Sequence, residues 1–168
     1  MASLFDKAAL GSLELQNHLV IAPMTRSRAT DNIPNALMAE YYGQRSSAGL
    51  IISEGISPSP NGLGYPRIPG LFSSAQVEGW KACTAAAHAG GAKIFAQFMH
   101  CGRVVHPLNM PVGARAVAPS ARGIPGEMFT DAQGMQPHPV PEAMSVRDIN
   151  DAIAEYAAAA RNGIEAGF

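Results

Sequence analysis

The chain has 168 residues, of which 47% are hydrophobic, and its formal net charge at pH 7 is −1. This composition supports one packed domain and excludes an intrinsically disordered chain. The near-neutral charge, with Lys and Arg scattered along the sequence, argues against nucleic acid or an anionic membrane as a partner.

The sequence predicts neither a membrane-spanning segment nor a metal site. No apolar run approaches the roughly 18 residues that a transmembrane helix needs. The first seven residues lack the basic start and apolar stretch of a secretory signal. Cys83 and Cys101 are the only cysteines, and no Cys or His spacing matches a zinc site. We therefore expect reduced thiols and a cytoplasmic protein.

The N-terminal segment predicts either a short hairpin or a lead-in over residues 10–15, and a strand over residues 19–22. The strand is a continuous apolar run, which suits burial on both faces of a parallel sheet, and it stops at Pro23. A helix is predicted over about 34–47, because Pro34 fits a first helical turn and the apolar residues after it follow helical spacing.

The next unit begins with a second buried strand over residues 50–54, followed by a loop over residues 55–70 that is rich in Gly and Pro. Ser73 and Gln76 have the spacing of a capping box, which predicts the start of a helix. That helix is expected to stop at Gly90, since glycine is typical of helix C-termini.

A third strand is predicted over residues 93–98. Residues from about 102 to 143 show no clear period, and they predict a long excursion with little regular structure of its own, a kind of loop that is usually functional. Ser145 and Asp148 then form a second capping box before a helix with an apolar stripe, which ends near Gly167.

The alternation of three strands with three helices predicts a parallel α/β sheet. A doubly wound sheet and a (β/α)₈ barrel are the competing architectures. Residues 23–26 read Pro-Met-Thr-Arg where a dinucleotide-binding turn would place a glycine-rich motif, so the doubly wound reading is weak. Three βα units are also too few to close a barrel, which takes eight units and about 250 residues.

Five blocks of the sequence resemble the Old Yellow Enzyme family, and its bacterial N-ethylmaleimide and xenobiotic reductases in particular. The blocks are residues 22–26; 39–42 with 48–54; 64–66 with 69–71; 96–98 with 100–103; and 117–120. They occur in the family's order, with near-family spacing, over essentially the whole chain. The resemblance implies that residues 1–168 are the N-terminal half, three βα units, of an FMN-binding (β/α)₈ TIM barrel that a second chain or fragment completes.

The resemblance also implies FMN as cofactor and NAD(P)H as reductant. Pro23, Met24 and Thr25 follow the first predicted strand. Gly55 closes the second strand, and Gln97 ends the third. In the family pattern these five residues contact the flavin ring, and the Thr25 hydroxyl donates toward the C4 carbonyl and stabilises charge on the reduced ring. Taken singly, each residue also fits an ordinary turn or strand end.

Two further residues are implied to lie on the substrate side of the ring, Tyr65 and Met99. Close relatives often carry Trp at the position of Met99, so the substrate pocket departs from the family pattern there. A lone histidine such as His100 is more often structural, and nothing in the sequence places a base and an orienting group around Cys101. Neither is included in the predicted site.

The family's alkene-binding His and Asn or His, its proton-donating Tyr and its flavin phosphate site belong to strands beyond Phe168. We therefore expect an oxidoreductase that reduces activated alkenes, such as enones and maleimides, once the C-terminal half of the barrel is supplied. Two alternatives remain open: a non-catalytic flavin-binding module, and a structural fragment that self-associates through its open sheet edges.

Overall fold

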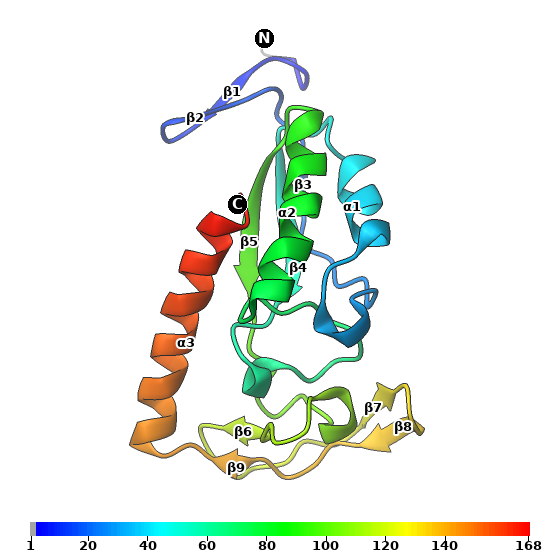
Figure 1. Ribbon diagram of the computed structural model, residues 1–168, viewed down its shortest axis with the longest axis vertical. Coiled ribbons are helices and arrows are strands. Elements are labelled where there is room, and N and C mark those ends of the chain that lie inside the picture. The colour runs from blue at the N-terminus through cyan, green and yellow to red at the C-terminus, as the bar shows by residue number, and fades with distance from the viewer. Residues whose placement is uncertain (1–2) are drawn as a thin grey trace.

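The computed structural model describes residues 3–168 and contains a central sheet of three parallel strands (Figure 1). The strands are, in sheet order, β3 (Val20–Ile21), β4 (Leu50–Ile56) and β5 (Lys93–Phe98). The helices that follow them are α1 (Ala36–Gly43), α2 (Ser74–Ala89) and α3 (Val146–Glu165). The predicted order of strands and helices is therefore confirmed.

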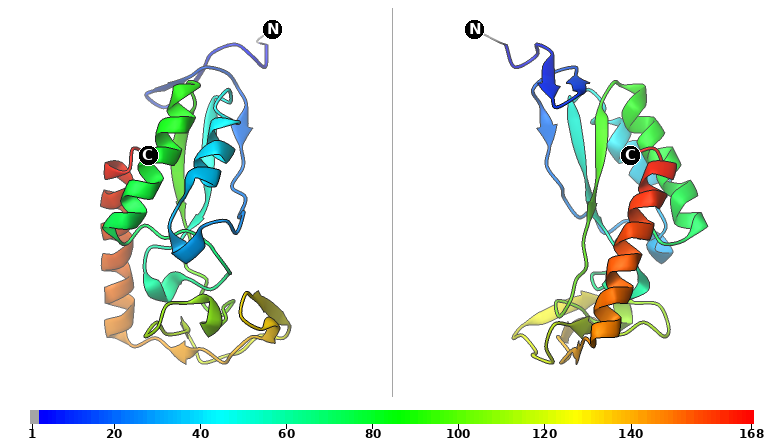
Figure 2. Two further views of the ribbon diagram at one scale, coloured as in Figure 1. Left: turned by 45° about the vertical axis from the view of Figure 1, so that its right-hand side comes forward. Right: turned by 90° about the vertical axis from the view of Figure 1, so that its left-hand side faces the viewer.

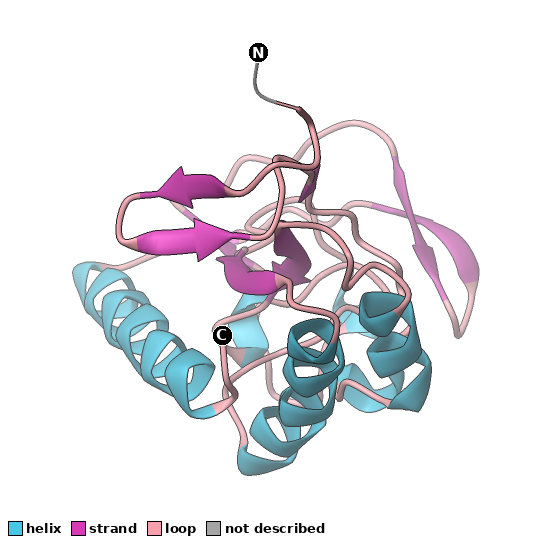
Figure 3. Cartoon of the chain, turned by 90° about the horizontal axis from the view of Figure 1, so that it is seen from above, coloured by secondary structure: helices cyan, strands magenta, loops and turns pink. Residues whose placement is uncertain are grey.

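All three helices cover the same side of the sheet, as the view along the strands shows (Figure 3). Side chains alternate accordingly: Ile94 in β5 is buried against the helices, whereas the adjacent Phe95 is 42% exposed on the other face. Val20 in β3 is likewise 52% exposed. The chain thus forms three βα units whose outer side is covered and whose inner side, the interior of a complete barrel, is open (Figure 2).

The main core lies between the sheet and the first two helices. Trp80 from α2 is fully buried there, and its indole N–H donates to the carbonyl of Gly70 at 3.1 Å. Its ring lies 5.8 Å from the ring of Tyr42 and 5.1 Å from that of Phe168. These contacts join α1, α2 and the C-terminal residue around one side chain.

Two element boundaries differ from the sequence-based expectation. The first helix begins at Ala36, not at Pro34, because the Asn35 side chain accepts the N–H of Met38 and caps the helix. Beyond Gly43 the backbone continues only as turns, so the helix is shorter than expected. The second strand is longer, since β4 continues to Ile56 with an irregular register after Ile52.

Residues 102–143 are mostly irregular, but they contain four short strands that the sequence did not predict. A hairpin joins β7 (Glu127–Thr130) to β8 (Gly134–Pro137), and β6 (Val117–Ala118) pairs in parallel with β9 (Glu142–Ala143). Thr130 closes the hairpin turn, because its hydroxyl accepts the N–H of Gln133 and donates to the Gly134 carbonyl. Strands of two to four residues are too short for a periodic signal.

The remaining elements are short. The predicted N-terminal hairpin is present as β1 (Ala8–Leu10) and β2 (Leu13–Leu15). Three 3-10 turns occur, η1 (Thr30–Asn32), η2 (Pro60–Gly62) and η3 (Pro107–Asn109). Within residues 3–168 no helix is both long and apolar enough to cross a bilayer, and no cluster of His, Cys, Asp and Glu has the geometry to hold a metal.

Both predicted capping boxes are present, at Ser73 with Gln76 and at Ser145 with Asp148. The Ser145 hydroxyl and N–H donate to the Asp148 carboxylate, and with the Arg115 guanidinium they lower the pKa of Asp148 from 3.8 to about 2. Because the folded-state pKa is depressed, the ionised carboxylate stabilises the helix start above pH 3.8, and this contribution is lost as the pH falls toward 2.

We therefore expect a peptide of residues 144–168 to be more helical than its Asp148→Asn variant at pH 5, with the two converging near pH 2. The Ser145 contacts are local, so the peptide retains them without Arg115. Circular dichroism at several pH values measures the difference, and the variant corrects for the other carboxylates in the helix. A difference that persists at the lowest pH would contradict this assignment.

Candidate functional site

The residues predicted to contact the flavin come together at the carboxyl ends of the parallel strands. Gly55 and Gln97 are register partners in β4 and β5. Residues 23–25 continue from β3, and the backbone N–H of the next residue, Arg26, donates to the carboxylate of Glu54 at 3.3 Å. Three strand ends therefore converge on one rim, as expected, whereas their contact with a flavin stays a prediction.

The polar groups on this rim are accessible. The side chains of Thr25 and Gln97 are exposed, and Met24 is 54% exposed. Gln97 is held by its backbone, whose N–H donates to the Ser53 hydroxyl at 3.0 Å. A hydroxyl, an amide with both donor and acceptor, and an apolar surface are thus presented together, and these groups suit a flat ring with a polar edge.

Packing in this chain also explains why position 55 is a glycine. A Cβ atom there would lie 2.8 Å from Cε and 3.1 Å from Sδ of Met99. The Met99 backbone N–H in turn donates to the carbonyl of Ile56 at 2.9 Å. Gly55 is thus the penultimate residue of β4, not the residue that closes it, and its lack of a side chain lets Met99 pack against the strand.

Tyr65 and Met99, the predicted substrate-side residues, pack against the same small cluster of Leu63, Ile68 and Cys101. Tyr65 also borders a groove of about 490 Å³ whose other side is the β7–β8 hairpin. The residues lining it are Ser27, Tyr65, Pro66, Arg67, Val104, Glu127, Met128, Phe129 and His138. Sequence reasoning missed the hairpin wall of this groove.

The hairpin is tied to the segment that carries Tyr65. The Asn109 amide donates to the carbonyl of Gly64 at 3.0 Å and to that of Phe129 at 2.9 Å. An ion pair between Arg67 and Asp131, at 2.9 Å, joins the same two segments. The excursion lies beyond the carboxyl ends of the strands (Figure 1), so it borders the rim where the predicted site residues meet.

The neighbouring His100 and Cys101 serve the fold. The Nδ1 atom of His100 accepts the Gly102 N–H at 3.0 Å, and burial lowers the pKa of the ring. Burial also raises the pKa of Cys101 to about 11, which keeps it a thiol. Cys83 is buried and free as well.

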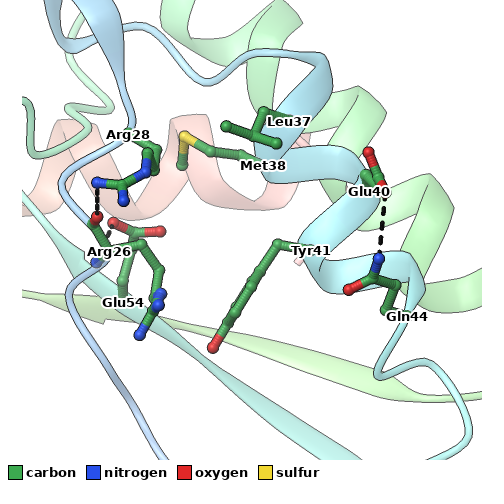
Figure 4. A pocket seen from close by; sticks show the side chains of 8 residues that line it. All are labelled: Arg26, Arg28, Leu37, Met38, Glu40, Tyr41, Gln44 and Glu54. Carbon is green, nitrogen blue, oxygen red and sulfur yellow. Dashed lines mark hydrogen bonds between the residues drawn. The ribbon is translucent and has the colours of Figure 1, made fainter.

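A buried carboxylate that the sequence prediction did not include lies directly under the rim. Glu54, only 1% exposed, accepts the Tyr42 hydroxyl at 3.3 Å as well as the Arg26 N–H. Burial raises its pKa, opposed by those two hydrogen bonds and the charge of Arg26. Figure 4 shows Glu54 facing Arg26 beside a hollow of about 170 Å³. The sequence did contain a signal for this residue, namely a charged side chain at the end of an otherwise apolar run.

Comparison with known proteins identifies the family. The model of the NADH:flavin oxidoreductase / NADH oxidase family matches residues 3–168. This chain belongs to that family. Within it, the chain groups with Old Yellow Enzyme proteins, whose cofactor is FMN and whose reductant is NAD(P)H.

Solved Old Yellow Enzyme structures match this fold closely. The homologue from Zymomonas mobilis superimposes with a TM-score of 0.92 at 45% identity, over 99% of this chain and 46% of that one. Morphinone reductase superimposes with a TM-score of 0.90 at 42% identity, over 98% of this chain and 46% of that one. The chain therefore corresponds to the N-terminal part of an Old Yellow Enzyme barrel.

Curated relatives in the family are named as reductases. They include 12-oxophytodienoate reductase 7 of Oryza sativa subsp. japonica, 36% identical over 99% of this chain and 43% of its own length. A probable flavin mononucleotide-dependent alkene reductase of Leishmania infantum is 40% identical over 95% of this chain and 45% of its own length. The chain thus spans less than half the length of these relatives.

Proposed function

We propose that this chain provides one side of the FMN site of an NAD(P)H-dependent ene reductase. The observation that carries the proposal is the convergence of residues 23–25, Gly55 and Gln97 on one rim of a parallel sheet, where barrel enzymes place their ligands. Bound FMN supplies hydride transfer from NAD(P)H to an activated alkene such as an enone or a maleimide. The chain's residues supply placement and polarity.

Each rim residue has a distinct part in this proposal. Pro23 and Met24 form an exposed apolar surface for the ring, and the Gln97 amide offers a donor and an acceptor to its polar edge. With FMN bound, the Thr25 hydroxyl would donate to the flavin C4 carbonyl, as the family resemblance implies, and would stabilise the reduced ring. Tyr65 and Met99 form one wall of the alkene pocket, because they share a cluster next to the groove under the hairpin.

We further propose that the remaining βα units complete the site, whether they follow in the same polypeptide or come from a second chain. Exposed apolar side chains support this, namely Val20 and Phe95 on the inner face of the sheet and Ile149, Ile153 and Ile164 along α3. An apolar inner face and an apolar helix stripe are the surfaces that a complete barrel buries.

The Thr25→Ala variant tests the role of the rim. A hydrogen bond that strengthens as the ring gains charge favours the reduced state, so its loss should lower the flavin reduction potential. Charge-assisted bonds contribute roughly 1.5–3 kcal/mol, and about 1.4 kcal/mol corresponds to about 30 mV for a two-electron couple. We therefore expect a shift of tens of millivolts, measured by redox titration of the FMN-loaded, completed barrel.

The matched control is Thr25→Ser, which keeps the hydroxyl and should leave the potential close to that of the parent protein. An equal potential in all three proteins would show that Thr25 is only a turn residue. Equal shifts in both variants would assign the effect to the lost methyl group.

A further inference from the structure

The Glu54 carboxylate connects three elements at the base of the rim. It belongs to β4, its Oε1 accepts the hydroxyl of Tyr42 from α1, and its Oε2 accepts the backbone N–H of Arg26 from the loop after β3. The Tyr42 hydroxyl also accepts the backbone N–H of Glu54 at 3.1 Å. Burial and the neighbouring carboxylate raise the pKa of Tyr42 well above its usual value, so this hydroxyl stays protonated and donates.

Stability alone is a poor explanation for this arrangement. A buried carboxylate loses its hydration, and an apolar side chain of similar volume often stabilises a protein as well or better. Arg26 lies nearby, but its guanidinium forms no ion pair with Glu54 within 4.0 Å in the part of the chain that the structure describes, and both hydrogen bonds to the carboxylate are long at 3.3 Å. The carboxylate is better explained by what its hydrogen bonds hold in place.

Those bonds hold the two segments that form the rim. The Arg26 N–H belongs to the peptide unit that directly follows Thr25, and Glu54 directly precedes Gly55. The next residue, Ser27, has a left-handed backbone conformation (φ 53°). The bond from Arg26 to Glu54 therefore links this loop to β4 directly after Thr25, while the Arg26 guanidinium lies over the ring of Tyr41 from α1.

We propose that Glu54 is a positioning residue, anchored by Tyr42, that holds the Arg26 backbone so that the Thr25 hydroxyl reaches the flavin. This inference rests on the proposed function, because it assigns Glu54 an effect on the flavin only through Thr25. Glu54 itself lies in the core beneath the rim, so it acts without touching the ring.

A mutant cycle on the FMN-loaded, completed barrel separates positioning from charge. Glu54→Gln and Glu54→Met have side chains of similar length, and both are neutral, but only Gln keeps an acceptor for the Arg26 N–H. Each is combined with Thr25 and with Thr25→Ala, and the potential of the bound flavin is measured in all four proteins. Thermal unfolding of each protein confirms that it is folded.

With Thr25 present, the equilibrium constant for flavin reduction should be about tenfold lower in Glu54→Met than in Glu54→Gln, which corresponds to a reduction potential about 30 mV lower. With Thr25→Ala, the two should agree within about twofold, or about 9 mV. If Glu54→Met does not fold, Tyr42→Phe, which removes the anchor of the carboxylate, replaces it. Tyr42→Phe is then compared with the parent chain. Its flavin reduction potential should be lower than that of the parent when Thr25 is present, and the two should agree when both carry Thr25→Ala.

The outcomes distinguish this inference from the function on which it rests. A potential that responds to Thr25→Ala but is equal in the two Glu54 variants would overturn the positioning role and leave the proposed function intact. A difference between the Glu54 variants that persists in Thr25→Ala would also overturn it, since the effect would bypass the hydroxyl. A potential insensitive to Thr25→Ala itself would overturn the positioning role together with the part of the proposed function that assigns Thr25 to the flavin.

Discussion

The isolated 168-residue chain is expected to reduce no enone and to hold little or no FMN, whereas adding the remaining βα units should restore both together. Its three parallel strands form an open sheet, which cannot enclose a ring. From the family resemblance we expect the groups that grip the alkene carbonyl and the flavin phosphate to lie on later strands. We expect FMN binding and turnover to appear as one event.

The same open surfaces should drive the association. Burial of apolar area contributes about 25 cal/mol per Å², and Val20, Phe95 and the α3 stripe are exposed until the barrel closes. Co-expression with the segment that follows the matched region in the Zymomonas mobilis homologue, followed by flavin absorbance and NAD(P)H oxidation with an enone or maleimide, provides the measurement.

Three results would be informative in that experiment. An isolated chain that reduces enones at a rate typical of flavoenzymes would contradict the half-barrel proposal. Flavin binding without turnover in the completed barrel would favour the non-catalytic flavin-binding alternative. Self-association of the chain that excludes the added segment would favour the structural alternative.

Ile153→Lys, which places a charge in the exposed stripe of α3, should weaken association with the added segment without touching the rim.

Trp80→Ala should cause the largest loss of stability among core variants. The side chain is fully buried and joins two helices with the C-terminal residue. Truncation of a buried Trp to Ala costs about 3–5 kcal/mol. Trp80→Phe keeps an aromatic ring but leaves the Gly70 carbonyl without its donor, which costs about 1–3 kcal/mol. Urea unfolding of the completed barrel measures both.

Circular dichroism is the appropriate signal for that measurement, because Trp80 is the only tryptophan of the chain and its replacement removes the tryptophan fluorescence that the chain contributes. Val112→Ala, at a fully exposed position, serves as a control and should leave stability within about 0.5 kcal/mol of the parent. Similar losses for Trp80→Ala and Trp80→Phe would show that the indole hydrogen bond, and not the packed ring, dominates.

The sequence predicted the sheet because its signals are local and strong. Continuous apolar runs such as residues 93–98 and capping pairs such as Ser73 with Gln76 are present in the structure as predicted. Residues that follow successive parallel strands must meet at one edge, so the placement of Thr25 and Gln97 also followed from the order of elements.

The parts that were missed depend on contacts between distant segments. The β7–β8 hairpin is fixed by Asn109 and by the pair of Arg67 with Asp131, and neither interaction leaves a periodic trace in the sequence. Glu54 was read as the last residue of a strand, although a carboxylate in an apolar run is itself a reason to look for a partner.

The short parallel pair at the base of the excursion has a consequence for how relatives of this protein can diverge. Because Val117 and Ala118 pair with Glu142 and Ala143, the segment between them leaves and re-enters the fold at adjacent points. Insertions or deletions in that segment can therefore be absorbed without shifting the register of the sheet or the start of α3. Replacing residues 119–141 would change the shape of the groove beside Tyr65 and would leave the parallel strands in place.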